Sequence, residues 1–202
     1  MILLPRLYAI ADATFGDPVK LAGLLFQGGA RLLQVRNKRG SVRDLLGQVE
    51  AILRLAPPEA RVLVNDRVDV ALLSCAHGVH LGQDDLPIEH ARSVLGNEAV
   101  IGFSTHNPDQ ARRADESPID YIAVGPIFPT HTKESPDPVL GLEGLQEISR
   151  MVRKPIVAIG GITLERASAV FAAGATSVAV ISDLLKAGDI VDRTKLWIDR
   201  SV

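Results

Sequence analysis

Two hydroxyl side chains and one ammonium group follow an apolar run that has the composition of a buried strand. The run covers residues 121–124 and continues into a Gly-Pro pair, and Thr130, Thr132 and Lys133 come shortly afterwards. Hydrogen-bond donors just beyond a strand favour the binding of an anion. A solvated loop, in which the threonine side chains form local turns, explains the same residues equally well. This segment alone leaves both interpretations open, but similar patterns recur along the chain.

A polar stripe marks an earlier apolar run, residues 32–36. Gln34, Arg36 and Lys38 are spaced by two, so in an extended chain they share one face. Strands of a parallel sheet are normally apolar on both faces, so a buried glutamine and arginine here need partners. The partner of Arg36 is either an anionic ligand or an acid from a neighbouring strand, which would make an internal ion pair.

Acidic residues follow the next two apolar runs. Asp66 ends one of them, and Asp84 and Asp85 come after the other. Mg²⁺ prefers one or two carboxylates together with water and substrate phosphate oxygens, so acids from adjacent strand ends suit this ion. Each acid alone is also a good N-cap for the helix that follows it. Because the acids would face the basic stripe, the combination favours a site for magnesium and a diphosphate.

Ser104 and His106 stand at the end of a further apolar run, residues 100–104. The Ser104 hydroxyl can donate to a phosphate, and it can equally begin a turn. His106 has the chemistry of a general base, although a structural role fits it better. The sequence leaves a proton-transfer role for this histidine undecided.

Glycine and backbone amides mark the ends of the last two apolar runs. Gly160 and Gly161 follow the first of these runs, and Ile181 and Ser182 end the second before a short helical pattern. Barrel enzymes often bind phosphate at the loops after strands seven and eight, where glycine lets the backbone approach an anion closely. These loops therefore favour a phosphate site made of backbone amides. The alternative is that glycine only permits tight strand-to-helix packing.

Strands that alternate with helices are needed to position these residues. The apolar, strand-like runs are residues 7–11, 32–36, 62–65, 78–81, 100–104, 121–124, 156–159 and 177–181. The helical patterns are residues 18–27, 42–55, 68–75, 87–95, 108–114, 142–152, 164–173 and 183–186. Such alternation predicts parallel strands with right-handed crossovers, and eight units most simply close into an α/β fold of the (β/α)₈ TIM-barrel type. An open doubly wound sheet is the alternative. Without a recognisable linker, we expect one compact catalytic domain over residues 1–202.

Composition excludes several classes of partner. The chain has 202 residues, a formal net charge of −2 and interspersed charges, so no basic surface for nucleic acid or a membrane is expected. The single cysteine, Cys75, cannot form an internal disulfide, which agrees with a reducing, cytoplasmic environment. No signal peptide or membrane span is predicted. A monomer and a homo-oligomer both stay open.

Two anion sites follow from these patterns, one with cations and carboxylates and one with backbone amides. Thr130, Thr132 and Lys133 lie between them in the predicted barrel. A transferase that joins a diphosphate substrate to a phosphorylated acceptor fits this pair of sites better than a hydrolase does. The residue types and their spacing do not identify the two substrates.

Several motifs, in order along nearly the whole chain, resemble those of the thiamine-phosphate synthase family. They are Gln34-x-Arg36-x-Lys38, Asn65-Asp66-Arg67, Gln83-Asp84-Asp85, Gly102-x-Ser104-Thr105-His106, Thr130-x-Thr132-Lys133 and Gly160-Gly161-Ile162. Each motif is weak alone, but their order and spacing are specific. The resemblance implies a barrel enzyme that condenses 4-amino-2-methyl-5-(diphosphooxymethyl)pyrimidine with carboxythiazole phosphate. The implied products are thiamine phosphate, diphosphate and CO₂.

The resemblance also implies roles for individual residues. The pyrimidine diphosphate would be held by Gln34, Arg36, Lys38, Asn65, Ser104 and Lys133, with Arg36, Lys38 and Lys133 as the catalytic cations. Asp66 and Asp85 would bind Mg²⁺. The thiazole phosphate would be held by Thr130, Thr132, Gly161, Ile181 and Ser182.

Two other functions compete with this one. A thiazole tautomerase of the same fold resembles the synthase, but it carries a catalytic histidine where this chain has Pro126 and tends to lose the acids that match Asp66 and Asp85. A non-catalytic protein that binds thiamine precursors is the third alternative. Retention of the basic stripe and of both acids argues against it.

Overall fold

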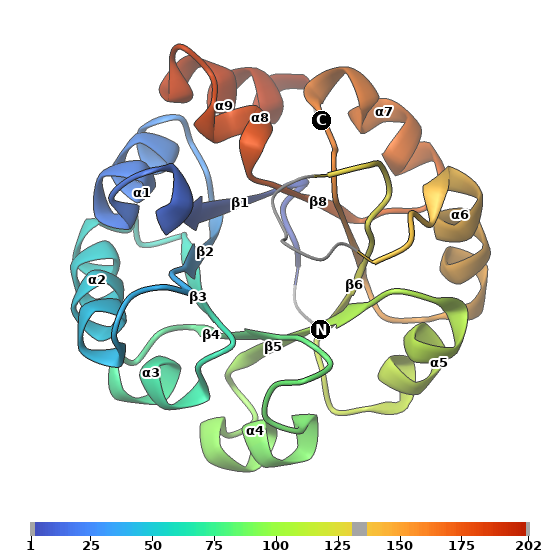
Figure 1. The fold of residues 1–202 in the computed structure, drawn as a ribbon, viewed down its shortest axis with the longest axis horizontal. Coiled ribbons are helices and arrows are strands. Elements are labelled where there is room, and N and C mark those ends of the chain that lie inside the picture. The colour runs from blue at the N-terminus through green and yellow to red at the C-terminus, as the bar shows by residue number, and fades with distance from the viewer. Residues whose placement is uncertain (1–2, 131–136, 201–202) are drawn as a thin grey trace.

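Eight parallel strands close into a barrel in the computed structural model, which describes residues 3–130 and 137–200. The strands pair in chain order, and β1 pairs with β8 to complete the ring (Figure 1). Closure excludes the open doubly wound sheet. The strands are β1 (Leu7–Asp12), β2 (Leu32–Arg36), β3 (Arg61–Asn65), β4 (Gly78–Leu81), β5 (Val100–Thr105), β6 (Tyr121–Val124), β7 (Ile156–Ile159) and β8 (Ser177–Val180).

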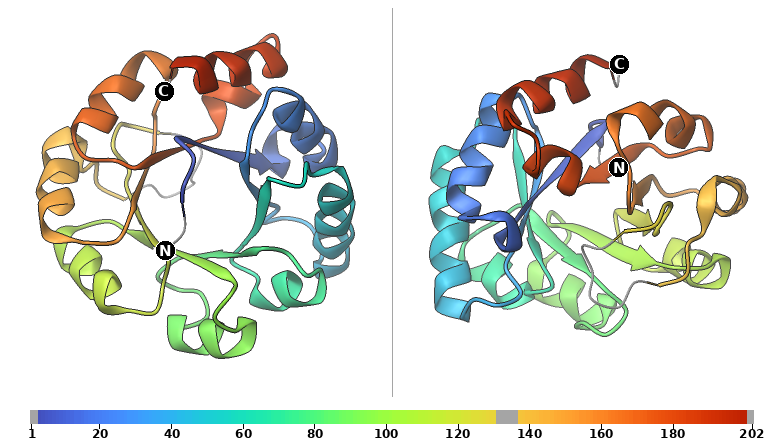
Figure 2. Two further views of the ribbon diagram at one scale, coloured as in Figure 1. Left: turned by 180° about the vertical axis from the view of Figure 1, so that it is seen from behind. Right: turned by 45° about the horizontal axis from the view of Figure 1, so that its top comes forward.

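Helices surround the barrel as an outer ring, which Figure 2 shows from behind and from an oblique angle. They are α1 (Pro18–Gln27), α2 (Val42–Leu55), α3 (Val68–Leu73), α4 (Ile88–Leu95), α5 (Pro108–Glu116), α6 (Gly141–Met151), α7 (Leu164–Ala172), α8 (Ser182–Leu185) and α9 (Ile190–Arg200), together with the 3₁₀ turn η1 (Ala13–Phe15). Within the ranges described, no helix has both the length and the apolar character needed to cross a bilayer.

Helix boundaries follow local capping chemistry. Asp17 accepts a hydrogen bond from Val19 N ahead of α1, and Ser41 and Asp44 form a reciprocal capping box at the start of α2. The predicted helix over residues 68–75 ends early, at Leu73, and Cys75 has a left-handed φ of 56°. The prediction also missed α9, whose Trp197 is fully buried and donates from Nε1 to Asp183 Oδ2 at 2.7 Å.

Alternate residues of each strand serve two different cores. One set points outward and packs against the helices, as Leu33 and Val35 of β2 do. The other set points into the barrel, where Tyr8, Ile10 and Leu63 pack together. This inner set is apolar at its base and polar toward the carboxyl ends of the strands. The barrel therefore holds the inward-facing polar residues of β2 to β5 around one opening.

Candidate active site

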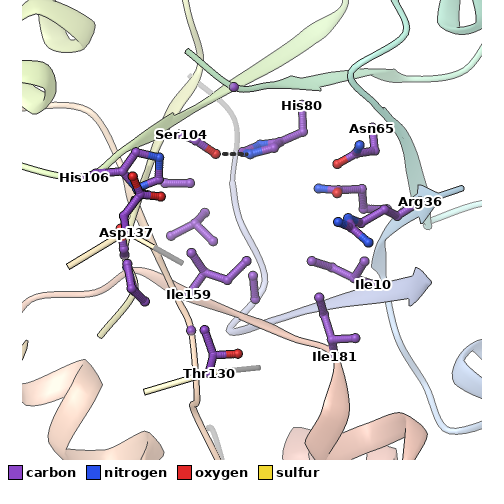
Figure 3. A pocket seen from close by; sticks show the side chains of 18 of the residues that line it. Ile10, Arg36, Asn65, His80, Ser104, His106, Thr130, Asp137, Ile159 and Ile181 are labelled. Atoms are coloured by element: carbon purple, nitrogen blue, oxygen red, sulfur yellow. Dashed lines mark hydrogen bonds and ion pairs between the residues drawn. The ribbon is translucent and has the colours of Figure 1, made fainter. Parts of the chain in front are cut away.

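A cavity of about 470 Å³ opens at the carboxyl ends of the barrel strands. Figure 3 shows side chains from several strands that point into it. The sequence-predicted residues that line it are Gln34, Arg36, Lys38, Asn65, Asp66, Asp85, Ser104, Thr130, Gly161, Ile181 and Ser182. Thr132 and Lys133 fall outside the described residues. The fold thus brings together, in one cavity, every predicted site residue that it describes.

Arg36 forms an ion pair with an acid from a neighbouring strand, which is one of the two partners that the sequence predicted for it. Its Nη1 donates to Asp12 Oδ2 at 2.5 Å, and the register of β1 and β2 places these two residues side by side. Asp12 is buried, and its other oxygen accepts from Thr14 N and Oγ1. Arg36 nevertheless lines the cavity. Because a guanidinium has five N–H donors, the ion pair orients Arg36 without using up its capacity to bind an anion.

Neither predicted N-cap forms at the two acids. The helix α3 begins after Arg67 and α4 after Pro87, and neither helix has a side-chain cap. Asp66 has a left-handed φ of 63°, and its Oδ2 lies 3.1 Å from Lys38 Nζ. Asp85 Oδ2 accepts from Gly82 N at 2.6 Å. Both carboxylates therefore belong to the cavity rather than to helix ends.

Asp66 and Asp85 are close enough to influence each other. Burial, followed by the charge of Asp66, raises the pKa of Asp85. A divalent cation would relieve the repulsion between the two groups. No group of three or more His, Cys, Asp or Glu side chains with metal-site geometry occurs among the described residues. Two carboxylates, completed by water and phosphate oxygens, still match the preference of Mg²⁺.

The loops opposite the acids carry the predicted glycines. Gly160 and Gly161 have positive φ values of 100° and 61°. A Cβ at Gly161 would lie 2.5 Å from Pro129 O, so only glycine fits this approach to the loop after β6. Nearby, α8 begins at Ser182 without a side-chain cap. Gly161 therefore packs closely against the loop after β6, and it also lines the cavity, where its predicted phosphate role stays a prediction.

His106 is held by the loop after β6. Its Nδ1 lies 2.7 Å from Gly125 O and 3.5 Å from Asp137 Oδ2. These contacts fix the ring at the edge of the cavity, across from Arg36 and Asn65 (Figure 3). They agree with the structural role that the sequence favoured.

A buried hydrogen-bonded group at the base of the cavity was missed by sequence reasoning. Tyr8 accepts from Gln34 Nε2 at 2.8 Å and lies 3.1 Å from the Tyr121 hydroxyl. His80 Nδ1 is 2.8 Å from the same Tyr121 hydroxyl, and His80 Nε2 is 2.9 Å from Ser104 Oγ. The sequence did contain a signal for this group: one histidine and two tyrosines lie within predicted strands. When such side chains are buried, their polar atoms need hydrogen-bond partners.

Burial controls the ionisation of this group. Burial lowers the pKa of His80 to about 4, so its imidazole is neutral near pH 7. Burial likewise raises the pKa of Tyr8 and of Tyr121 above the ordinary phenol range. The rings also pack closely: Tyr8 meets Tyr121 edge to face, and His80 stacks on Tyr121 with centroids 5.7 Å apart.

Comparisons with known proteins agree with the geometry. The family model described as thiamine monophosphate synthase matches residues 7–184. The thiamine-phosphate synthase of Koribacter versatilis is 52% identical over 189 residues, 90% of each chain, and that of Chlorobium phaeovibrioides is 46% identical over 179 residues, 88% of this chain and 85% of the other. A solved thiamine phosphate pyrophosphorylase from Pyrococcus furiosus superposes with a TM-score of 0.90 at 34% identity, covering 97% of this chain and 95% of its own. The barrel, its cavity and these relatives together show that the chain belongs to the thiamine-phosphate synthase family.

Proposed function

We propose that this chain transfers the 4-amino-2-methylpyrimidin-5-ylmethyl group from its diphosphate to the ring nitrogen of carboxythiazole phosphate. The carbon–oxygen bond to diphosphate breaks with its electron pair on the diphosphate, and the thiazole nitrogen supplies the pair for the new carbon–nitrogen bond. Loss of the thiazole carboxylate as CO₂ leaves its electron pair on the ring carbon, which takes up a proton from solvent to give thiamine phosphate. This is the reaction that the motifs of the sequence imply.

One observation supports the proposal: cationic side chains and the loops predicted to offer backbone amides line the same cavity. Arg36 and Lys38, with the carboxylates beside them, lie on the β2 to β4 side. The amide-rich loops at Gly161 and Ser182 lie on the β7 and β8 side. A hydrolase needs one such site, whereas a transferase with two phosphorylated substrates needs both.

The residues act by stabilising charge and by orienting the substrates. Gln34, Arg36, Lys38, Asn65, Ser104 and Lys133 are assigned to the pyrimidine diphosphate, and Thr130, Thr132, Gly161, Ile181 and Ser182 to the thiazole phosphate. Arg36, Lys38 and Lys133 neutralise negative charge as it grows on the leaving diphosphate, which is electrostatic catalysis without a protein nucleophile. The closed barrel aims the thiazole nitrogen at the cationic carbon and keeps water away from it.

Asp66 and Asp85 are the proposed magnesium ligands. When bound, Mg²⁺ supplies further positive charge for the diphosphate. The carboxylates are available for this because neither caps a helix and because Lys38 neutralises only part of their charge. A cytoplasmic location agrees with the single cysteine and stays a prediction.

The test is one incubation of the protein with both substrates and Mg²⁺, followed by assays of diphosphate and thiamine phosphate. We expect both products to form in equal amounts. The competing tautomerase is disfavoured because Pro126, which lines the cavity, offers no titratable atom for moving a proton. Isomerisation of the thiazole with no diphosphate release would refute the synthase assignment.

The metal assignment needs matched aspartate variants. Asp66→Asn and Asp85→Asn should each lower turnover by about 10²-fold, the scale of one lost transition-state interaction. Asp69→Asn is the control, because Asp69 pairs with Arg67 on an exposed surface close to Asp66 in the chain. Full activity of Asp66→Asn with the metal chelated would remove the magnesium hypothesis.

A further inference from the structure

A continuous line of hydrogen-bonded groups connects two ends of the cavity. It runs from the Ser104 hydroxyl through both ring nitrogens of His80 to the Tyr121 hydroxyl and then to the Tyr8 hydroxyl. Figure 3 shows its first link, between Ser104 and His80. Ser104 and Tyr8 both line the cavity, so each end of the line can meet a ligand.

The line has one more proton than it has links. Ser104, His80, Tyr121 and Tyr8 each carry one polar hydrogen when the imidazole and both phenols are neutral. The three links use three of these four hydrogens. One hydrogen is left over, and it can be offered to a ligand at Ser104 or at Tyr8, but not at both while all three links are intact.

The tautomer of His80 decides which end receives this hydrogen. If Nδ1 carries the proton, it donates to Tyr121, and Nε2 takes the hydroxyl hydrogen of Ser104. If Nε2 carries the proton, it donates to Ser104, whose own hydrogen then points into the cavity. In that second arrangement Tyr8 donates to Tyr121 and accepts from Gln34 Nε2.

We propose that His80 is a positioning residue which, as the Nε2–H tautomer, makes Ser104 a hydrogen-bond donor to the diphosphate of the substrate. This inference rests on the proposed function, because it needs an anion beside Ser104. The anion draws the free hydrogen to the Ser104 end and so sets the direction of the whole line. Tyr8 then faces the cavity as an acceptor, which suits an N–H donor on the pyrimidine.

Burial makes each hydrogen bond of this line costly to break. Tyr8 and Tyr121 are almost fully buried, and His80 is 8% exposed. A broken link in such surroundings leaves a polar atom without a partner, which is costly. All hydrogen bonds of the line therefore point in one direction or all in the other. A ligand that fixes the hydrogen bond at one end also fixes the donor or acceptor role of the hydroxyl at the other end.

Nitrogen NMR of ring-labelled histidines tests the proposal directly, with inorganic diphosphate and Mg²⁺ as the probe. His80→Gln assigns the His80 signals. We expect a neutral His80 with its proton on Nε2 in the diphosphate-bound protein. His77 is an internal reference in the same spectrum, because its Nδ1 accepts from Val62 N at 3.1 Å and must therefore be unprotonated. A proton on Nδ1 of His80, or on both nitrogens, in the bound protein would overturn the proposal.

Kinetic variants separate positioning through Ser104 from a merely structural role. His80→Leu should lower turnover on the order of 10²-fold, as expected for a lost transition-state donor. His80→Gln should recover much of this activity, because its amide nitrogen can donate to Ser104. In a Ser104→Ala background, His80→Leu should cost little more. An equal loss in both backgrounds would mean that His80 does not act through Ser104.

The two measurements also separate this inference from the proposed function. The NMR experiment needs only diphosphate binding and no turnover. Normal synthesis of thiamine phosphate with His80 protonated on Nδ1 would refute the inference alone. Absence of synthesis, with diphosphate bound and His80 protonated on Nε2, would refute the proposed reaction alone.

Discussion

At the scale of single residues, the sequence predicted which side chains meet but not all of their partners. The spacing of Gln34, Arg36 and Lys38 placed them on one face, and all three line the cavity. Their partners Tyr8, Asp12 and Asp66 come from other segments. Those pairings depend on strand register, which is a property of the closed sheet and has no local signal in the chain.

The Asp12–Arg36 ion pair leads to a prediction about orientation. Asp12→Asn keeps the size of the side chain but removes the charge that holds Arg36 Nη1. We expect kcat/KM for the pyrimidine diphosphate to fall about tenfold or more, equivalent to about 1.4 kcal/mol of transition-state stabilisation. Steady-state kinetics at saturating thiazole phosphate measures this.

Asp17→Asn is the matched control for that variant. Asp17 accepts from Val19 N as the N-cap of α1 and is not among the residues that line the cavity. Asparagine is also a good N-cap, so both stability and activity should stay close to those of the parent chain. If the two variants lose activity equally, the ion pair does not orient Arg36 for catalysis.

At the scale of elements, the sequence predicted the alternation of strands and helices but did not predict the final helix. Every predicted strand is present, with ends that differ by no more than a residue. The helical patterns predicted from the sequence end at residue 186, before α9. Trp197 is buried where α9 packs on α1 and α8, and it bonds to Asp183 of α8, so this helix adds packing that strand–helix alternation does not predict.

The loop at Gly161 leads to a prediction about the binding of the two substrates. Gly161→Ala should weaken binding of thiazole phosphate far more than binding of pyrimidine diphosphate, because a Cβ would meet Pro129 O and Phe128 Cβ and displace the loop after β6. Gly96→Ala is the control: Gly96 also has a positive φ, but no atom lies within 4 Å of its added Cβ. Calorimetric binding of each substrate to both variants is the measurement. Equal weakening of both substrates in Gly161→Ala would contradict two separate anion sites.

At the scale of the whole molecule, the predicted closed (β/α)₈ barrel is confirmed, although the sequence left an open sheet as the alternative. Eight strand–helix units fit a barrel or an open sheet, and only the pairing of β1 with β8 decides between them. Closure has a chemical consequence, since it brings Tyr8 of β1 within hydrogen-bond distance of Tyr121 of β6 across the interior. The buried polar group at the base of the cavity exists only because the sheet closes.

This buried group makes the stability of the whole molecule depend on pH in a defined way. The pKa of His80 is about 4 in the folded protein, compared with 6.5 for an ordinary histidine. Between these values the unfolded chain binds a proton that the folded chain does not, so the free energy of unfolding falls as the pH is lowered from 6.5 to 4. The slope for one such group is at most about 1.4 kcal/mol per pH unit. Below pH 4 this contribution becomes constant.

Urea unfolding of the parent chain and of His80→Gln at pH 7 and pH 4.5 isolates this effect. Glutamine does not titrate, so the loss of stability between the two pH values should be smaller in the variant by about 2 kcal/mol. Titration of the other side chains is common to both proteins and cancels in the comparison. His90→Gln, which removes an exposed imidazole from α4, is the matched control and should follow the parent chain. If His80→Gln loses as much stability as the parent between the two pH values, His80 is not held neutral by burial. The line of hydrogen bonds from Ser104 to Tyr8 would then lack the neutral imidazole, with one N–H, on which its direction depends.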